Sequence, residues 1–325
     1  MKETGILCLF TFLTTACLLQ SEKAAAFAAN GLNLWFQKMI PTLLPFMILS
    51  GILIRMNLSD RFARLFSPLF KPVFRLSDSC IYILIIGFLC GFPMGARVTA
   101  ESLRHGKISK REASLMLAFC NNIGPIYFTG YVLKLFPVEF PWPYLTGMYL
   151  IPLLYGLFLR YTVFRDIPME GFSNVIGKLH AASVHSECCE KSVHSDYLYS
   201  VNEKSGPELF HAMQESITSA LVSQATLGGY MILFNLLNLI PDLILPARYS
   251  VLRAFCGCLL EITGGLSVFP KSQAIWAFTF LQFGGLSCIA QTNSMIQGTS
   301  LSLREYVFHK LNQMLLTFCY YLFLV

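Results

Sequence analysis

Long stretches without a charged side chain are the feature that most constrains this sequence. Nine of them cover residues 4–21, 24–37, 39–54, 79–96, 113–133, 140–159, 216–241, 272–303 and 311–325. A helix needs about 20 largely apolar residues to cross a bilayer, so the pattern predicts a polytopic membrane protein. Several stretches are too short or too interrupted for a simple span, and residues 272–303 are too long for one. We therefore expect seven to nine membrane segments, some of them half-helices.

Composition excludes other classes of protein. Of the 325 residues, 55% are hydrophobic and 13% are charged, whereas a soluble domain carries about 25% charged residues. This excludes a soluble enzyme, a disordered chain and a nucleic-acid-binding module. The net charge is +6. In a membrane protein, such an excess of basic residues usually lies in the cytoplasmic loops. Most of the eleven cysteines lie in apolar stretches, where cysteine acts as a small hydrophobe, so we expect no structural disulfide.

The first charge-free stretch follows Lys2 and precedes the small residues at 24–29, as in a secretory signal. Because no soluble domain follows it, an uncleaved first span is the favoured interpretation.

A hydrophilic interval at residues 165–206 divides the chain. It predicts a first membrane half at 1–164, a loop at 165–206 and a second membrane half at 207–325. The loop carries His180, His185, Cys188, Cys189 and His194. Their spacing fits no standard zinc pattern, and no catalytic set of side chains is evident. The sequence therefore predicts neither a metal, nor a cofactor, nor an enzyme.

The two halves share a short pattern. Gly91 precedes an aliphatic-Ser-x-Arg-Glu element at residues 108–112, and Gly284, 193 positions later, precedes the same element at residues 301–305. Repeated halves with interrupted hydrophobic segments are typical of transporters. We therefore expect an all-α transmembrane bundle of two repeated halves, inverted relative to each other, with broken helices and re-entrant segments.

Charge distribution also predicts a re-entrant hairpin. Residues 55–75 carry five Arg or Lys residues, and residues 97–111 carry a second basic cluster. If both face the cytoplasm, residues 79–96 must enter and leave the membrane on the same side.

The densest helix-breaking element contains Gly91, Phe92, Pro93 and Gly95. Glycine and proline disfavour a continuing helix, and non-helical backbone at membrane depth must line a cavity or lie within protein. The segment is therefore a candidate substrate site, and a kink that serves packing is the alternative. Arg97 follows directly and either binds a carboxylate with its planar fork or extends to the membrane interface.

Uncharged polar residues mark further candidate binding positions. Asn121 and Asn122 precede a Gly-Pro pair within an apolar stretch, and the second half offers Gly284, Gly285, Gln291 and Asn293. Amide side chains can hydrogen-bond a polar solute. They can equally hold helices together inside a membrane.

Two acidic residues are candidates for ion or proton coupling, namely Glu101 and Glu261. Glu261 lies between the apolar stretches of the second half. A carboxylate at membrane depth is a functional hypothesis, and an interfacial glutamate is the alternative.

Several segments together resemble the sporulation integral membrane protein YlbJ family, part of the nucleoside-recognition, or Gate-domain, membrane proteins. They are residues 91–97, Glu101, Gly106, residues 108–109, residues 112–113 and residues 119–125. The resemblance is strongest over residues 87–130 and extends more weakly through residues 261–265 and 291–292. The arginine at position 97, where lysine is more frequent in the family, and the loop with Cys188 and Cys189 depart from the family pattern.

This resemblance implies a transporter of a spore-forming bacterium that moves dipicolinic acid across the outer forespore membrane. The glycine breaks, Arg97, the amides and the Phe92 ring would supply donors, a cation and an aromatic wall for this planar dianion. A non-transporting membrane protein of spore assembly and a nucleoside-like permease are the alternatives. The expected partners are the small anion and the lipid bilayer, without nucleic acid, and a homo-oligomer is left open.

Overall fold

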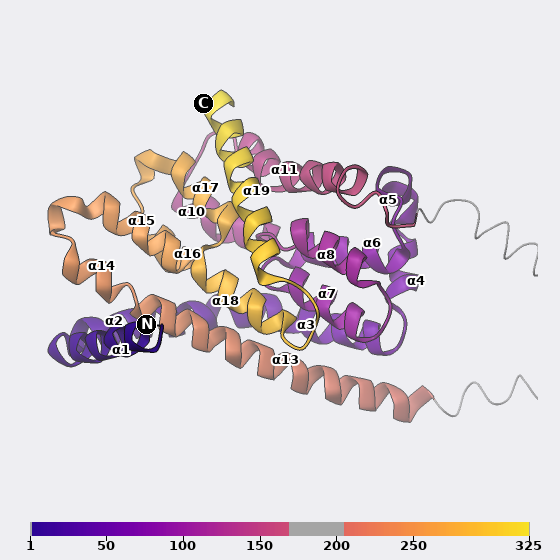
Figure 1. Ribbon diagram of the computed structural model, residues 1–325, viewed down its shortest axis with the longest axis horizontal. Helices are drawn as coiled ribbons and strands as arrows, with labels where there is room; N and C mark the ends of the chain where they lie inside the picture. Colours follow the sequence, from indigo (N-terminus) through magenta and orange to yellow (C-terminus); the bar gives the residue numbers. More distant parts are fainter. Residues whose placement is uncertain (1, 169–204, 325) are drawn as a thin grey trace, which may run out of the picture.

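The computed structural model describes residues 2–168 and 205–324. Within these ranges the chain is helical and contains no strand, which confirms the all-α class (Figure 1). The residues of the loop at 169–204, including Cys188 and Cys189, lie outside the described ranges.

The first half contributes α1 (Lys2–Leu19), α2 (Ser21–Leu34), η1 (Trp35–Met39), α3 (Ile40–Arg55), α4 (Ser59–Arg64), α5 (Ser67–Phe74), α6 (Asp78–Cys90), α7 (Met94–Arg104), α8 (Lys110–Phe119), α9 (Pro125–Tyr127), η2 (Phe128–Val132), α10 (Leu133–Leu135) and α11 (Trp142–Tyr161). The second half contributes α13 (Ser205–Leu236), α14 (Leu239–Ile244), η3 (Ala247–Tyr249), α15 (Ser250–Leu260), α16 (Ile262–Ser267), η4 (Lys271–Gln273), α17 (Ala274–Phe283), α18 (Gly285–Ile296) and α19 (Leu303–Leu324).

Four helical stretches of the described chain are long and apolar enough to cross a membrane: Ser21–Arg55, Trp142–Tyr161, Glu208–Ile244 and Lys271–Ile296. The pair formed by α5 and α6, bent by 106°, would make a fifth. The apolar stretches at 24–37 and 39–54, which the sequence separates at Lys38, form one continuous helix through η1. One lysine interrupts an apolar run without breaking the backbone hydrogen bonding of a helix.

The segment predicted to be re-entrant forms a hairpin of two helices, but its second helix extends past residue 96 and carries Arg97 and Arg104. α6 and α7 pack side by side and are joined by the short break after Cys90. Their outer ends meet at α4, because Ser79 donates to Asp60 at 2.7 Å and Lys107 donates to Ser59 at 2.9 Å. The chain therefore enters and leaves this hairpin at the same end of the bundle.

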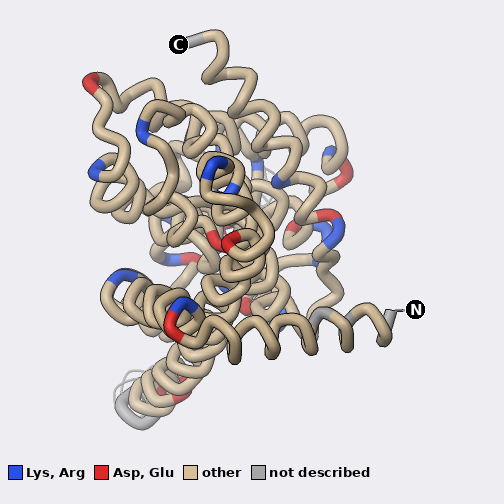
Figure 2. The backbone as a smooth tube through the Cα atoms, turned by 90° about the vertical axis from the view of Figure 1, so that its left-hand side faces the viewer, with Lys and Arg blue, Asp and Glu red and all other residues tan. Residues whose placement is uncertain are grey.

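The long helix α13 lies along α2 and α3 and connects the two halves (Figure 1). Trp35 donates its indole N–H to the Gln224 carbonyl at 2.9 Å. Outside this pair, α1 lies across one side of the bundle and buries Ala16 against Ala24 and Leu239 (Figure 2).

The shared Ser-x-Arg-Glu element starts a helix in each half. Ser109 caps α8, with Glu112 completing a capping box, and Ser302 accepts a hydrogen bond from the backbone N–H of Glu305 at the start of α19. A serine followed three residues later by glutamate is a general signature of a helix start. Capping therefore accounts for this match, and the predicted inverted repeat is not confirmed by it.

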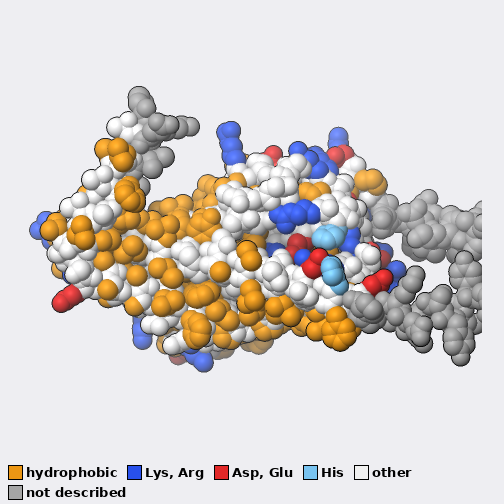
Figure 3. All heavy atoms as spheres, turned by 90° about the horizontal axis from the view of Figure 1, so that it is seen from below, with side chains coloured by type: hydrophobic (Ala, Val, Ile, Leu, Met, Phe, Trp, Pro, Cys, Tyr) orange, Lys and Arg blue, Asp and Glu red, His pale blue; other side chains and the backbone are white. Residues whose placement is uncertain are grey.

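The outer surface suits a lipid environment. Large apolar side chains are exposed on α3, α11, α13 and α19, for example Leu49, Phe158, Val222 and Phe323. Figure 3 shows hydrophobic side chains over most of one face, with charged and histidine side chains gathered toward one end. This distribution agrees with an integral membrane protein.

Candidate functional site

The break after α6 packs directly against the break after α8. Gly91 has a φ of +86°, a conformation that glycine adopts without a steric penalty. An added Cβ at Gly91 would overlap the Gly124 nitrogen, and one at Gly95 would overlap the Cys120 carbonyl oxygen. Only glycines at these positions let the two backbone segments touch. The predicted non-helical break is confirmed at residues 91–93, whereas Gly95 lies in the first turn of α7.

The second half brings two further breaks to the same place. Glu261, in extended conformation, separates α15 from α16, and Gly284 and Gly285 separate α17 from α18 with φ angles of +85° and +78°. An added Cβ at Gly284 would lie 3.1 Å from the Phe92 ring. The interrupted helices of the two halves therefore meet at Phe92.

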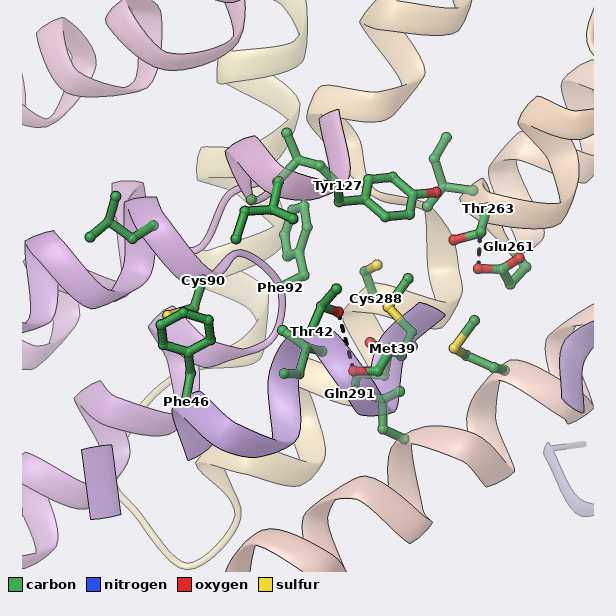
Figure 4. A pocket seen from close by; sticks show the side chains of 18 residues that line it. Met39, Thr42, Phe46, Cys90, Phe92, Tyr127, Glu261, Thr263, Cys288 and Gln291 are labelled. Carbon is green, nitrogen blue, oxygen red and sulfur yellow. Dashed lines mark hydrogen bonds between the residues drawn. The ribbon is translucent and has the colours of Figure 1, made fainter. Parts of the chain in front are cut away.

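These breaks surround one cavity, which we call the central cavity (Figure 4). Its walls come from η1 and α3, from the break after α6 (the first break) and from the break after α8 (the second break). The second half contributes α13, the Glu261 break and α18. The lining side chains include Met39, Thr42, Phe46, Cys90, Phe92, Ile123, Tyr127, Leu227, Met231, Glu261, Thr263, Cys288 and Gln291. Residues from both halves are thus needed to form it.

The central cavity is small in this conformation. The space in which the centre of a water-sized molecule fits measures about 50 Å³. By this measure one water needs about 10–15 Å³, so the cavity has room for a few waters. A solute with an aromatic ring and two carboxylates would require the breaks to move apart.

The polar wall of the central cavity is formed around Glu261 (Figure 4). Its carboxylate accepts hydrogen bonds from the backbone N–H groups of Thr263 and Gly264 and from the Asn235 amide, at 3.2, 2.6 and 3.1 Å. The nearby Tyr127 hydroxyl is buried and has no hydrogen-bond partner among the described residues. The Glu261 carboxylate thus has its hydrogen bonds satisfied, whereas the Tyr127 hydroxyl is free to donate. This wall can therefore bind a polar group.

The predicted site residues divide into those that line the central cavity and those that shape it. Phe92, Gln291 and Glu261 line it. The predicted glycines and proline are not among the lining side chains and set the course of the chain around the cavity, at the breaks or in the first turn of the helix that follows: Gly91, Pro93, Gly95, Gly284 and Gly285.

The two asparagines lie beside the central cavity but bond to other helices. The Asn121 amide donates to Thr292 and Tyr306 at 2.9 and 3.0 Å, and its oxygen accepts from the backbone N–H of Ala96. Asn122 donates to the Phe119 carbonyl at 2.6 Å. Neither residue lines the central cavity, nor does Asn293. Asn121 therefore links α7, α18 and α19, as the alternative interpretation expected.

Arg97 is buried rather than exposed at an interface. One guanidinium nitrogen lies 3.3 Å from the Glu101 carboxylate and 3.1 Å from the Ser219 hydroxyl. Arg97 and Glu101 are 2% and 6% exposed. The two candidate residues thus form a buried ion pair on α7, directed toward α13.

Sequence reasoning missed two further buried cations, Arg160 on α11 and Lys310 on α19, of which Lys310 lies beside the central cavity. The Lys310 ammonium donates to the Asn121 carbonyl, the Asn122 side-chain oxygen and the Gln313 side-chain oxygen at 3.2–3.3 Å. No carboxylate of the described residues lies within ion-pair distance of it. The available sequence signal was a row of polar and tyrosine residues at helical spacing along α19, all of which the structure buries: Tyr306, Lys310, Gln313, Thr317 and Tyr321.

Within the described ranges, no group of three His, Cys, Asp or Glu side chains is placed to hold a metal ion. Eight of the nine cysteines described there are free thiols, and the thiol of the ninth, Cys80, donates to the Glu112 carboxylate at 3.6 Å.

Two comparisons with known proteins agree with the geometry. Residues 36–136, which include α3, the α6–α7 hairpin and the second break, match the Gate family model, described as nucleoside recognition. The chain is also 24% identical to the sporulation integral membrane protein YlbJ of Bacillus subtilis (strain 168), over 94% of this chain and 78% of that protein. These findings confirm the resemblance predicted from the motifs. No solved structure matches the chain.

Proposed function

We propose that this protein is a carrier for a small organic anion, with dipicolinic acid as its substrate, in the outer forespore membrane of a sporulating cell. One observation carries the proposal: four interrupted helical segments, drawn from both halves, converge on the central cavity. Broken helices around a central site are the arrangement that secondary transporters use to bind solutes at membrane depth. The similarity to a sporulation membrane protein supports the cellular context.

Lys310 supports the choice of an anion. A buried charge without a counter-ion is costly, and an anionic ligand would offset that cost. The Phe92 ring lies 4.9 Å from the ammonium and also lines the central cavity. Movement of Phe92 when the breaks separate would give a carboxylate in the cavity access to Lys310.

Glu261 supports coupling to a proton or another cation. A carboxylate in the wall of the central cavity repels an anionic substrate while it is charged. Binding of a proton or a monovalent cation there would remove the repulsion, so substrate and cation would bind together. The Tyr127 hydroxyl, directed toward this wall, is an unused donor (Figure 4).

The direct test is transport by the purified protein in liposomes. We expect uptake of radiolabelled dipicolinate above that of protein-free liposomes, with competition by unlabelled dipicolinate but not by pyridine, which lacks the carboxylates. Equal uptake with and without protein would contradict the proposal.

A nucleoside permease is the second candidate, because the matched family model is described as nucleoside recognition. Labelled uridine in the same liposomes separates the two. Uptake of uridine without uptake of dipicolinate would favour the permease, and uptake of neither would favour a non-transporting role in spore assembly.

A further inference from the structure

A line of polar side chains runs between α3, α7 and α13, away from the central cavity. We call it the polar seam and define it by Ser50 on α3, Arg97 and Glu101 on α7, and Ser216, Ser219 and Gln224 on α13. All except Ser219 are more than nine-tenths buried. The Arg97–Ser219 hydrogen bond, at 3.1 Å, joins α7 to α13 across it.

The polar seam has a hollow at each end. The central cavity is lined by Phe46 from α3, Phe92 from the first break and Leu227 from α13. At the other end lies a second pocket of about 550 Å³, which we call the charged pocket. It is lined by Arg55 at the end of α3, His105 directly after α7 and Glu215 on α13. Figure 3 shows histidine and charged side chains gathered at that end of the molecule.

Unpaired polar atoms concentrate along the polar seam. In the described part of the chain, eight buried side-chain nitrogen or oxygen atoms have no hydrogen-bond partner, and four of them belong to Arg97, Glu101 and Gln224. Buried polar groups in folded proteins are nearly always hydrogen-bonded, and exceptions are explained by a bound water, an ion or a ligand. Several buried polar atoms of the polar seam therefore lack a hydrogen-bond partner among the described residues.

The length of the polar seam suits a route through half of a membrane. On α13, Leu227 follows Glu215 by twelve positions, which is about 18 Å at 1.5 Å per residue. The hydrocarbon core is about 30 Å thick. A charged pocket at the membrane surface would thus place the central cavity near the midplane.

We infer that the polar seam is the hydrated path by which a small anion passes between the charged pocket and the central cavity, with Arg97 as an intermediate binding point. This inference rests on the proposed carrier function and adds the route to it. Arg97 offers two free guanidinium nitrogens to a carboxylate, and Ser216 and Ser219 offer hydroxyl groups along the way. Movement of α7 away from α3 and α13 would open the path and leave the packing of α3 against α13 unchanged.

The test is the reactivity of single introduced cysteines. Ser219→Cys and Ser216→Cys place a thiol in the polar seam with almost no change in volume. Ala220→Cys, in the apolar core, and Leu221→Cys, on the lipid-exposed face of the same helix, are matched controls. The reagent is the anionic, membrane-impermeant methanethiosulfonate ethylsulfonate, and mass spectrometry of the α13 peptide separates the introduced cysteine from the native ones.

We expect the seam cysteines to react at least tenfold faster than both controls, and dipicolinate to slow their reaction. Reaction at the rate of the controls in both seam variants would overturn the path. Fast reaction without protection by dipicolinate would keep the path and contradict dipicolinate as the substrate. Each variant is first checked for a single symmetric peak in size-exclusion chromatography, and two seam positions ensure that one unstable variant does not decide the result.

Discussion

The Lys310 ammonium lies 4.9 Å from the centre of the Phe92 ring, so a buried cation and the aromatic wall of the central cavity are in contact across 218 positions of sequence. An ammonium over a ring face is stabilised by a cation–π interaction worth about 0.5–2 kcal/mol. That energy does not replace a counter-ion. The pair is therefore suited to separate when an anion arrives.

Lys310→Met tests this relationship. The substitution keeps an unbranched side chain but removes the charge, so we expect dipicolinate affinity to fall about ten- to hundredfold, the cost of lost hydrogen bonds to a charged group. Thermal stability should change little, because the removal of an uncompensated buried charge is offset by the loss of the hydrogen bonds that Lys310 donates to Asn121 and Asn122. Calorimetric titration and thermal unfolding in detergent measure the two effects. Lys110→Met, at an exposed position, is the control, and unchanged affinity in Lys310→Met would exclude Lys310 as an anion site.

Arg97 gives a second prediction. Arg97→Gln should weaken dipicolinate binding about ten- to hundredfold, and Arg97→Lys should recover part of the loss, because the charge matters even without the planar fork. Arg97→Gln alone also leaves Glu101 buried without its partner. The double variant Arg97→Gln/Glu101→Gln should therefore regain stability but not affinity. If the double variant binds like wild type, Arg97 serves the ion pair alone.

Gly95→Ala should destabilise the protein by about 1–3 kcal/mol, the usual cost of overpacking a well-packed interior. The added methyl would overlap the Cys120 carbonyl oxygen and push the first two breaks apart. Gly130→Ala is the matched control, because nothing lies within 4 Å of a Cβ built there. Thermal unfolding in the same detergent compares them, and equal melting temperatures would show that the two breaks do not depend on this contact.

Asn121→Leu should lower stability, because it leaves three buried partners without a hydrogen bond: the Thr292 and Tyr306 hydroxyls and the Ala96 backbone N–H. Each unsatisfied group costs about 1–3 kcal/mol. Loss of transport in this variant would thus reflect packing. A fully stable but inactive Asn121→Leu protein would instead point to a direct role in binding.

Glu261→Gln tests coupling. If a proton on Glu261 permits anion binding, wild-type dipicolinate uptake should rise as the pH falls, and Glu261→Gln, which is neutral at every pH, should remove that dependence. Uptake in liposomes at several pH values, without a pH gradient, measures it. Identical pH profiles for the two proteins would refute a coupling role for Glu261.

The sequence by itself determined where the helices stop. Gly91, Pro93 and Gly284 lie where the structure breaks, because glycine and proline act on their own backbone and need no partner. The charge-free stretches likewise determined a membrane environment. The reversal of the chain between α6 and α7 agrees with the hairpin expected from the basic residues on both sides of 79–96, and its re-entry into the membrane stays a prediction. These are local or compositional properties.

Only the tertiary structure decided which polar side chains face the central cavity. Asn121 and Gln291 look alike in sequence, yet Asn121 bonds to Thr292, 171 positions away, while Gln291 lines the cavity. Lys310, unremarkable in its helix, becomes a buried cation only when α19 packs against the second break. The side of a helix that meets a cavity depends on how distant segments pack, and one sequence carries no direct record of those long-range contacts.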